Sequence, residues 1–292
     1  MLGWLDANLI SIVDGVAFGL LYFTLAVGLS LIFGMMDVLN LAHGTLYLGG
    51  AYLAYRLADG GWPGLLLALG AGLVIGLAGG ALLTALTQPL GHRGHLDQAL
   101  LTLGVSIVGA EIFAIVTAGE YLPVAAPAAL ADSTPLAGHA YPVYRLVFIG
   151  VAGLLAVAGY LVFERSSIGA LVRATVADRE MVRALGIDTR KVLLGVFAAG
   201  AVLAAVGGVL GAPILQPGPR VDEHVLLMSL IVVVIGGLGS VRGALLGALL
   251  VGQVETLGRA IVPQYAGWLL FAVMFAVLAA RPRGLVALAR AR

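Results

Sequence analysis

The 292-residue sequence contains no cysteine, which excludes disulfide bonds and thiolate-bound metal sites. Charged residues are also scarce: they make up 11% of the chain, whereas soluble domains carry about a quarter. Hydrophobic residues make up 61%, and the mean hydropathy is +1.07. These values predict an all-α, polytopic transmembrane bundle. The net charge of +1 gives no reason to expect a nucleic-acid partner.

Several catalytic patterns are missing as well. The sequence has no Walker A motif, so we do not expect the chain itself to hydrolyse ATP. It has no HExxH motif for a metal, and Ser240 in GGLGS lacks the GxSxG context of a nucleophilic serine. We therefore expect neither catalysis, nor a metal, nor a cofactor. No Lys or Arg precedes Arg56, so we expect the first apolar run to be a retained span and not a cleaved signal peptide.

Nine apolar segments approach the length of a membrane span, which is roughly 20 residues. They are 8–34, 40–57, 62–86, 98–118, 142–163, 192–212, 225–241, 243–262 and 265–280. We expect a single transmembrane domain over residues 1–292 with about eight to ten spans. Glycines four apart, such as Gly72, Gly76 and Gly80, suggest close helix packing.

The basic residues suggest the orientation, because cytoplasmic loops are enriched in Lys and Arg. If residues 164–191 are cytoplasmic, the five spans before them place the N-terminus outside, and the four after them return the C-terminus inside. Twelve of the sixteen basic residues are then cytoplasmic, including Arg93, Arg290 and Arg292. The loop 119–141 has three prolines and no Lys or Arg. It would lie outside, either as a plain connection or as a surface for a soluble partner.

The one long hydrophilic segment, residues 164–191, carries six of the sixteen basic residues. Ser166 or Ser167 is typical of a helix N-cap, and Asp178 to Leu185 predicts a second short helix that ends at Gly186. Asp188 or Thr189 would cap the next apolar helix. Two interpretations remain open from the pattern alone: a docking surface for a soluble partner, or a solvated loop that fixes the topology.

Two predicted spans, 40–57 and 225–241, are short and rich in glycine or polar residues. Each is the second span of its half of the chain, and the two run in opposite directions. Transporters with inverted repeats place the substrate path at interrupted segments in corresponding positions. We therefore expect these segments to face each other along a path that includes Asn40, His43, Gly44, Thr45, Ser229, Gly236, Gly237, Gly239 and Ser240.

Ionisable residues inside spans are costly and often functional. Glu111 is the best candidate for a proton relay, although a buried structural acid is the more common case. Asp14 lies near the start of the first span, and Glu255 is the third intramembrane acid. His43 is the only histidine inside a predicted span, and it suits either contact with a substrate or simple packing.

Three stretches, 33–54 (with NLAHG), 183–213 (with RALGIDTRK) and 232–257 (with GGLGS), resemble a known family. The chain is similar to the permease subunits of ABC importers for branched-chain amino acids, a family that also includes urea and short-amide permeases. The resemblance extends over nearly the whole chain. NLAHG makes it closer to the LivH-like than to the LivM-like member of the pair.

The resemblance implies a passive gate in the bacterial inner membrane. Two permeases pair, usually this one and a LivM-like subunit, bind two cytoplasmic ATP-binding subunits, and receive the substrate from an external solute-binding protein. Residues 164–191 then become the ATPase coupling region, with the contacts assigned to Arg173, Asp178, Met181, Arg183, Leu185, Gly186 and Ile187.

The chain departs from the family pattern at two positions. Thr45 stands where the family often has Glu, and Met228 where it often has Lys before Gly-Gly-Leu-Gly. These departures bear on the substrate and not on the fold. Two other classes of function remain as alternatives. The first is a secondary transporter in which Glu111 or Asp14 carries a coupling proton, and the second, weaker one is an intramembrane enzyme that uses His43.

Overall fold

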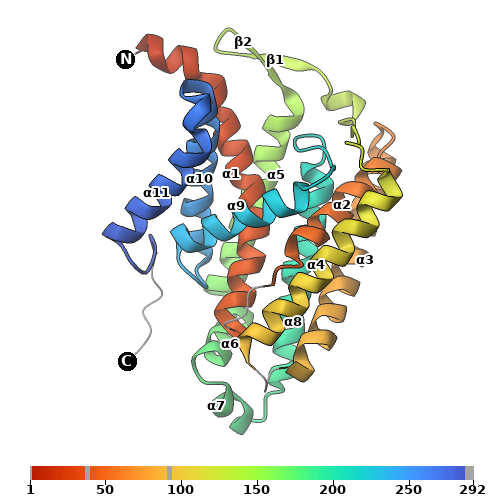
Figure 1. Ribbon diagram of the computed structural model, residues 1–292, viewed down its shortest axis with the longest axis vertical. Coiled ribbons are helices and arrows are strands. Elements are labelled where there is room, and N and C mark those ends of the chain that lie inside the picture. Colours follow the sequence, from red (N-terminus) through yellow and green to blue (C-terminus); the bar gives the residue numbers. More distant parts are fainter. Residues whose placement is uncertain (1, 37–39, 91–93, 287–292) are drawn as a thin grey trace.

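The computed structural model describes residues 2–36, 40–90 and 94–286, which form eleven α-helices and one β-hairpin (Figure 1). The helices are α1 (Leu2–Met36), α2 (His43–Leu57), α3 (Trp62–Thr87), α4 (His95–Thr117), α5 (Val143–Tyr160), α6 (Ser167–Ala177), α7 (Arg179–Ala184), α8 (Thr189–Gly211), α9 (Val221–Gly236), α10 (Val241–Ile261) and α11 (Ala266–Ala280). The strands are β1 (Ser133–Leu136) and β2 (His139–Pro142). The protein is thus a helical, polytopic bundle, as its composition predicts.

Each of the nine predicted spans coincides with a helix. Within the described part of the chain, seven helical segments are long and apolar enough to cross a membrane: Asn8–Phe33, Trp62–Leu90, His95–Thr117, Val143–Arg165, Thr189–Gly211, Val241–Ile261 and Pro263–Ala280. The other two helices, α2 and α9, have only 15 and 16 residues. At 1.5 Å per residue, a helix of this length is shorter than the hydrocarbon core of a bilayer. The segments singled out as short in the sequence are therefore the short helices of the fold.

Helix α1 is the centre of the bundle. Its side chains between Leu20 and Ile32 are almost all buried, and it packs against α5, α8, α9 and α10. Small residues make this possible: a Cβ atom on Gly19 would lie 2.8 Å from the Ala248 carbonyl oxygen of α10, and one on Gly28 would lie 2.7 Å from Gly200 Cα of α8. Close backbone approach of this kind is how helices associate in lipid.

Glycines also join α2 and α3 to α8. A Cβ atom on Gly76 or Gly80 of α3 would lie within about 2.6 Å of an α8 backbone atom, so the glycines four apart do mark a helix contact. Gly50 of α2 would collide with the Ala205 carbonyl group, and Gly208 of α8 would collide with that of Tyr47. The half-length α2 is therefore held in place by backbone contact along α8.

The charged pair α6–α7 lies at one end of the bundle, and the β-hairpin and the start of α1 lie at the other (Figure 1). The predicted topology requires the N-terminal end and residues 164–191 to lie at opposite ends of the bundle, as they do. Which end faces the cytoplasm stays a prediction. Three of the residues used for it, Arg93, Arg290 and Arg292, lie outside the described part of the chain.

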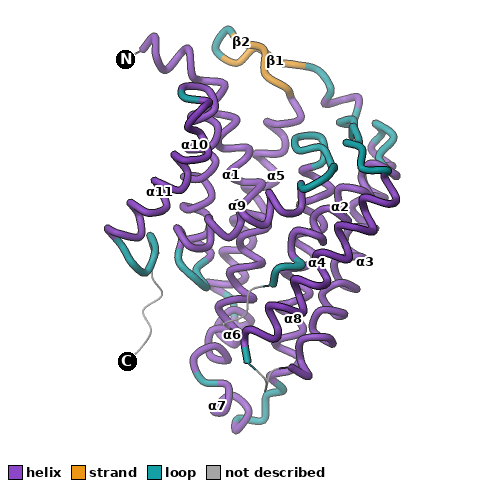
Figure 2. Tube along the Cα trace, in the orientation of Figure 1, coloured by secondary structure: helices purple, strands orange, loops and turns teal. Residues whose placement is uncertain are grey.

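The predicted exterior loop 119–141 contains the β-hairpin, which the sequence analysis did not predict. The tube in Figure 2 shows the two strands as the only extended segments among the described residues. Their turn is Ala137-Gly138, with φ values of 49° and 88°. Positive φ at both central residues is the type I′ geometry that suits the twist of a hairpin.

A polar cluster ties α1 to α5 beneath this hairpin. Arg145 Nη1 donates to Asp14 Oδ1 at 2.5 Å, and the Tyr141 hydroxyl donates to the same oxygen at 2.7 Å. Burial and the hydrogen bond to Asp14 raise the pKa of Tyr141 above its usual range, so the phenol stays a donor. Asp14 is thus a paired structural acid, which leaves little reason to expect it to carry a coupling proton.

We expect Arg145→Met to destabilise the protein by about 1–2 kcal/mol, because Asp14 loses its cation. The two side chains are 28% and 21% exposed, so the cost stays below that of a fully buried pair. The unfolding temperature of the detergent-purified protein measures the effect. The double variant Asp14→Asn/Arg145→Met is the control, and it should recover most of the loss; equal unfolding temperatures for wild type and Arg145→Met would contradict the expectation.

Candidate functional site

The tip of the bundle, α6 and α7 with the turn after them, is built by capping residues that the sequence predicts. Ser166 caps α6 by accepting from Gly169 N, and Asp178 caps α7 by accepting from Met181 N at 2.9 Å. Asp188 caps α8 by accepting from Arg190 N at 3.0 Å. Side-chain caps satisfy backbone N–H groups that a helix start leaves free. Three consecutive helix starts are therefore fixed by three local residues.

Gly186 ends α7 as predicted. Its φ is 82°, Gly186 N donates to the Arg183 carbonyl at 2.9 Å, and Ile187 N donates to the Val182 carbonyl at 3.3 Å. These two bonds form a Schellman motif, which places a left-handed residue just after the helix. A Cβ atom at Gly186 would meet nothing within 4 Å, so its backbone conformation, and not space, favours glycine here.

The tip exposes apolar side chains. Met181, Leu185 and Ile187 are 62%, 70% and 36% exposed, whereas Val182 is buried against the bundle. Val182 thus holds α7 onto the bundle. Large apolar side chains gathered at one polar end of a protein mark a contact surface.

Basic side chains surround this apolar surface. Arg179 and Arg183 donate to the Thr189 hydroxyl at 3.4 and 3.0 Å, which folds their stems back onto the start of α8. Partial burial lowers the pKa of Arg179, and the nearby Arg183 and Arg190 lower it further. The guanidinium stays charged all the same. Arg173 donates to the Phe163 carbonyl and braces α6 against the end of α5. The tip thus combines apolar contacts with excess positive charge.

The predicted path residues lie in the interior of the chain. Asn40, His43, Ser229 and Ser240 are 0–2% exposed. Gly44, Gly236 and Gly237 are buried, and Thr45 and Gly239 are partly buried. None of these nine residues lines either of two cavities found among the described residues, one between α1, α5 and α10 and one beside the start of α9. Whether they line a path in another state stays a prediction.

Most of these residues have structural roles in the described state. His43 Nε2 lies 3.0 Å from the Leu25 carbonyl of α1, Ser229 Oγ donates to the Val225 carbonyl, and Ser240 caps α10. Thr45 Oγ1 donates to Ser106 Oγ of α4 at 3.3 Å. The side-chain amide of Asn40, however, is buried with no hydrogen-bond partner for either of its polar atoms. Such a group is costly unless another state or a ligand satisfies it.

The two short helices meet where each begins. A Cβ atom on Gly44 of α2 would collide with the Asp222 carbonyl oxygen of α9 and lie 3.2 Å from Leu226 Cβ. At its other end, α9 stops at Gly236, and Gly237 and Gly239 have φ values of 101° and 75°. The predicted break at GGLGS is confirmed, and the helix begins four residues before the predicted start.

The prediction that Glu111 is a buried acid is wrong for this chain. α4 packs on α2 and α3 through residues such as Thr102 and Phe113, and Glu111 lies on its exposed side. Ile107, Ile112 and Ile115 around it are exposed as well. A carboxylate that faces hydrocarbon is costly, so this side of α4 needs water or another protein beside it.

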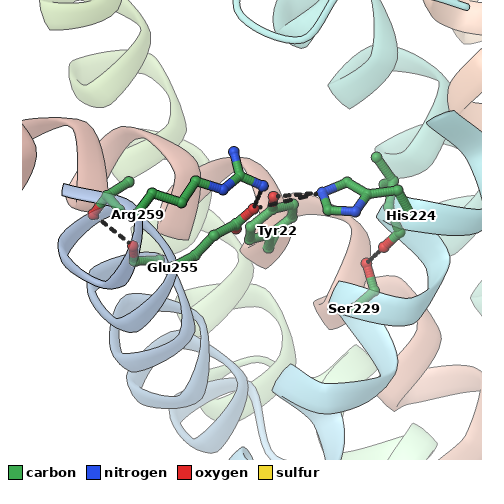
Figure 3. A network of polar contacts seen from close by, with 8 residues as sticks. Tyr22, His224, Ser229, Glu255 and Arg259 are labelled. Atoms are coloured by element: carbon green, nitrogen blue, oxygen red, sulfur yellow. Dashed lines mark hydrogen bonds and ion pairs between the residues drawn. The ribbon is translucent and has the colours of Figure 1, made fainter. Parts of the chain in front are cut away.

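A second polar centre joins α1, α9 and α10, and Figure 3 shows its side chains pointing toward one another. Arg259 Nη2 donates to Glu255 Oε1 at 2.6 Å within α10. His224 Nε2 lies 3.6 Å from the same oxygen and 3.3 Å from the Tyr22 hydroxyl. The Glu255 side chain is 6% exposed, and its Oε2 is buried without a partner.

This centre was only partly predictable. Glu255 stands out as an intramembrane acid, and the i,i+4 spacing to Arg259 is a local signal for an ion pair. His224 precedes the predicted span 225–241, but it lies in the first turn of α9 because that helix begins at Val221. Tyr22 is 202 residues away from His224 in the sequence, and no local pattern connects them.

Comparison with known proteins shows which family this chain belongs to. The sequence model of the family described as branched-chain amino acid transport system / permease component matches residues 11–278. The chain belongs to this family. It is therefore a multi-pass permease component of the inner membrane and not an enzyme.

Two relatives match the permease over almost their full length, and a third matches over a shorter part. It is 28% identical over 289 residues to the high-affinity branched-chain amino acid transport system permease protein BraD of Pseudomonas aeruginosa, with 94% of each chain covered. It is 28% identical over 292 residues to the corresponding protein LivH of Escherichia coli K12, covering 94% and 93%. The fructose import permease protein FruF of Bifidobacterium longum is 24% identical over 250 residues, covering 80% and 66%. The family resemblance seen in the sequence is confirmed, and its members carry more than one kind of solute.

Proposed function

We propose that this permease is the LivH-like subunit of an ABC importer for branched-chain amino acids, or for a related small amide or urea. The observation that carries the proposal is the family match over residues 11–278, shared with relatives named for branched-chain amino acid transport. The exposed tip of α6 and α7 agrees with it, because a permease without an ATP site requires a surface for subunits that have one.

The partners follow from the same proposal. A second, LivM-like permease completes the membrane unit, two cytoplasmic ATP-binding subunits dock at the tips, and a solute-binding protein delivers the substrate at the other end. The exposed Glu111 side of α4 supports a second subunit or water at this face, since lipid alone would leave a carboxylate poorly solvated. The loop 119–141 and its hairpin lie at the end where a binding protein would arrive (Figure 1).

Coupling is assigned to the tip. Met181, Leu185 and Ile187 offer the apolar contacts, and Arg173 and Arg183 the positive rim. Asp178 and Gly186 fix the two ends of α7. Movement of a docked ATPase would therefore displace α7 as a unit, and the buried Val182 and the hydrogen bond from Arg183 to Thr189 would transmit this displacement to α8. The helix is short and capped at both ends, which suits a rigid lever.

We expect Gly186→Val to uncouple ATP hydrolysis from transport. A β-branched residue in the left-handed region costs about 1–2 kcal/mol, which the turn can avoid by unwinding the end of α7. The measurement is the number of leucine molecules imported per ATP hydrolysed by the assembled transporter. Gly186→Asn is the matched control, since Asn tolerates this conformation, and it should keep the wild-type ratio. An unchanged ratio in Gly186→Val would count against the coupling role.

The translocation path is assigned to the region where α2 and α9 meet. Half-length helices that begin inside the membrane are a feature of transporter binding regions, and the unpartnered Asn40 amide lies just before α2. The path residues are buried in the described state, so the proposal requires that α2 and α9 part during transport. Paired cysteines along 40–48 and 229–240 test it: crosslinks that change with ATP support it, and no proximity in any state rejects it.

Reconstitution separates the importer from a proton-coupled secondary transporter. The purified chain is placed in proteoliposomes with and without its permease and ATPase partners, and uptake of leucine, urea and fructose from loaded binding proteins is scored. Leucine or urea uptake only in the full assembly with ATP is the expected result. Uptake by the chain alone, driven by a pH gradient, would overturn the proposal. Fructose uptake would move this permease to the sugar-carrying branch of its relatives.

A further inference from the structure

A groove of about 490 Å³ lies between α5 and α10, with α1 as its floor (Figure 1). Both flanking helices are long and apolar enough to cross the membrane, so the groove lies within it. From Gly153 to Tyr160 it follows α5 for about 10 Å, which is about two thirds of the depth of one leaflet. Val157 on its rim is 56% exposed, so the groove is open to molecules around the protein.

The walls of the groove are hydrocarbon along most of its length. The apolar side chains that line it include Val16, Leu20, Val157, Leu245 and Leu249. Such a wall offers no hydrogen bond to a polar ligand. Lipid tails are as apolar as the wall, so shape decides which apolar molecule fills it. An acyl chain is flexible enough to follow a groove of this kind and is present at this depth in every membrane.

Positive charge is concentrated at one end of the groove. Arg242 lines it and donates from Nη2 to the Tyr160 hydroxyl at 2.6 Å. The Arg242 Cζ atom also lies 4.9 Å from the centre of the Tyr160 ring. Arg165 Nε donates to the same hydroxyl at 3.4 Å. Two guanidinium groups therefore meet at one phenol, at the end of the groove nearest to α6.

This pair of guanidinium groups has no anion to balance it. Neither Arg165 nor Arg242 takes part in any of the ion pairs found among the described residues. The phenol accepts hydrogen bonds, but each guanidinium has five N–H donors, most of which stay available to a ligand. Arg242 is moreover the second residue of α10, where the helix dipole favours an anion and opposes a cation. An anion between the two arginines would relieve both conflicts.

We propose that this groove is a binding site for an anionic phospholipid. The phosphate group accepts hydrogen bonds from Arg165 and Arg242, because guanidinium groups match the oxygens of a phosphate. One acyl chain lies in the groove against Leu20 and Leu249. Basic pockets between spans bind anionic headgroups at the cytoplasmic side, and the end with α6 and α7 is the predicted cytoplasmic end. The inference does not depend on which solute the permease carries.

A lipid at this place would tie two segments together. Arg165 ends the helical segment Val143–Arg165, which leads directly into α6, and Arg242 lies in the first turn of α10. A shared phosphate group would therefore hold the base of the α6–α7 tip to the start of α10. A free phosphate ion could reach the two arginines but would leave the groove empty.

Native mass spectrometry of the delipidated full-length chain tests the proposal by measuring the dissociation constant of the first bound lipid. We expect phosphatidylglycerol to bind at least about fivefold more tightly than phosphatidylcholine with the same acyl chains, because the choline group cancels the phosphate charge. Glycerol 3-phosphate, which has the phosphate but no acyl chain, should not bind at the same concentrations. Equal binding of the two lipids, or binding of glycerol 3-phosphate as tight as that of phosphatidylglycerol, would overturn the proposal.

Variants locate the site by two independent routes. Arg165→Gln and Arg242→Gln each remove one guanidinium group, and each should raise the dissociation constant of phosphatidylglycerol at least about fivefold. Val157→Trp keeps both charges but fills the groove from its exposed rim, and it should weaken binding to a similar extent. All three positions are exposed, so the variants should fold. An unchanged dissociation constant in all three would place the lipid elsewhere.

Arg190→Gln is the matched control for general attraction to the charged end of the bundle. Arg190 is exposed and is also the second residue of a helix, α8, but it does not line the groove. The dissociation constant of phosphatidylglycerol should not change in this variant. A loss equal to that of Arg242→Gln would mean that the lipid is attracted by the summed charge and not held at a site.

A second permease subunit is the competing occupant of the groove. Co-purification of a tagged partner subunit with Val157→Trp separates the two cases. We expect the variant to retain the partner like the wild type while it loses the lipid. Loss of the partner with unchanged binding of phosphatidylglycerol would show that the groove is a subunit interface.

Discussion

The double variant Met181→Asp/Leu185→Asp is expected to abolish ATPase docking and, with it, ATP-dependent import. Both side chains are more than half exposed at the tip of the bundle, and both are large and apolar. Contact residues of this kind contribute about 2 kcal/mol or more each when they are central to an interface. Because a factor of ten in affinity is 1.4 kcal/mol, each substitution should weaken docking about thirtyfold. Two of them should leave no complex at micromolar concentrations.

Co-purification of tagged ATPase with the permease measures this effect. Because the two positions are exposed, the variant should fold and extract like the wild type. Ala129→Asp/Ala131→Asp is the matched control: it adds the same two charges at exposed alanines in the loop 119–141, at the other end of the bundle. The control should retain the ATPase in full. Full retention by the double variant would show that the ATPase docks elsewhere.

Replacing Gly50 by alanine is expected to cost about 3 kcal/mol, which is large for the addition of one carbon atom. The new Cβ atom would overlap the backbone of Ala205, which cannot rotate away as a side chain can. Helices α2 and α8 must then separate, and overpacking strain of this kind costs about 1–3 kcal/mol or more. The unfolding temperature of the detergent-purified protein should fall by several degrees, since a loss of 1 kcal/mol lowers it by roughly 2–4 °C in a chain of about this size.

Gly49→Ala provides the control from the same helix turn. A Cβ atom at Gly49 meets nothing within 4 Å, so the substitution adds no clash. Alanine is also a better helix former than glycine by roughly 0.5–1 kcal/mol. Gly49→Ala should therefore equal or exceed the wild type in thermal stability. Equal thermal stability of Gly49→Ala and Gly50→Ala would mean that α2 and α8 do not touch at Gly50.

The parts of the fold that were predictable depend on local signals. Long apolar runs located nine helices, and the caps Ser166, Asp178 and Asp188 located the starts of α6, α7 and α8 within one or two residues. Gly186 was predictable because only glycine adopts the left-handed region without strain. In each case, the residues that determine the structure lie within a few positions of one another.

The other parts depend on packing between distant residues. Glu111 was expected to be buried because it lies inside a span, but burial depends on which side of α4 faces the bundle, and an apolar helix gives no pattern for that. Tyr22 and His224 come together only when α1 and α9 pack, so this polar centre has no sequence signature beyond Glu255 and Arg259. The hairpin depends on the Ala137-Gly138 turn, a weaker signal than Asn-Gly.

The most direct test of the central claim is crosslinking from single cysteines at the tip of α7, in a chain that has no cysteine of its own. Leu185→Cys and Ala137→Cys are each assembled with an ATPase that carries one cysteine at its permease-facing surface, and disulfide formation is scored with and without ATP. A permease that couples through α6 and α7 predicts crosslinks from position 185 that change with ATP, and none from position 137 in the hairpin. Crosslinks from position 137, or none from position 185 in any nucleotide state, would contradict it.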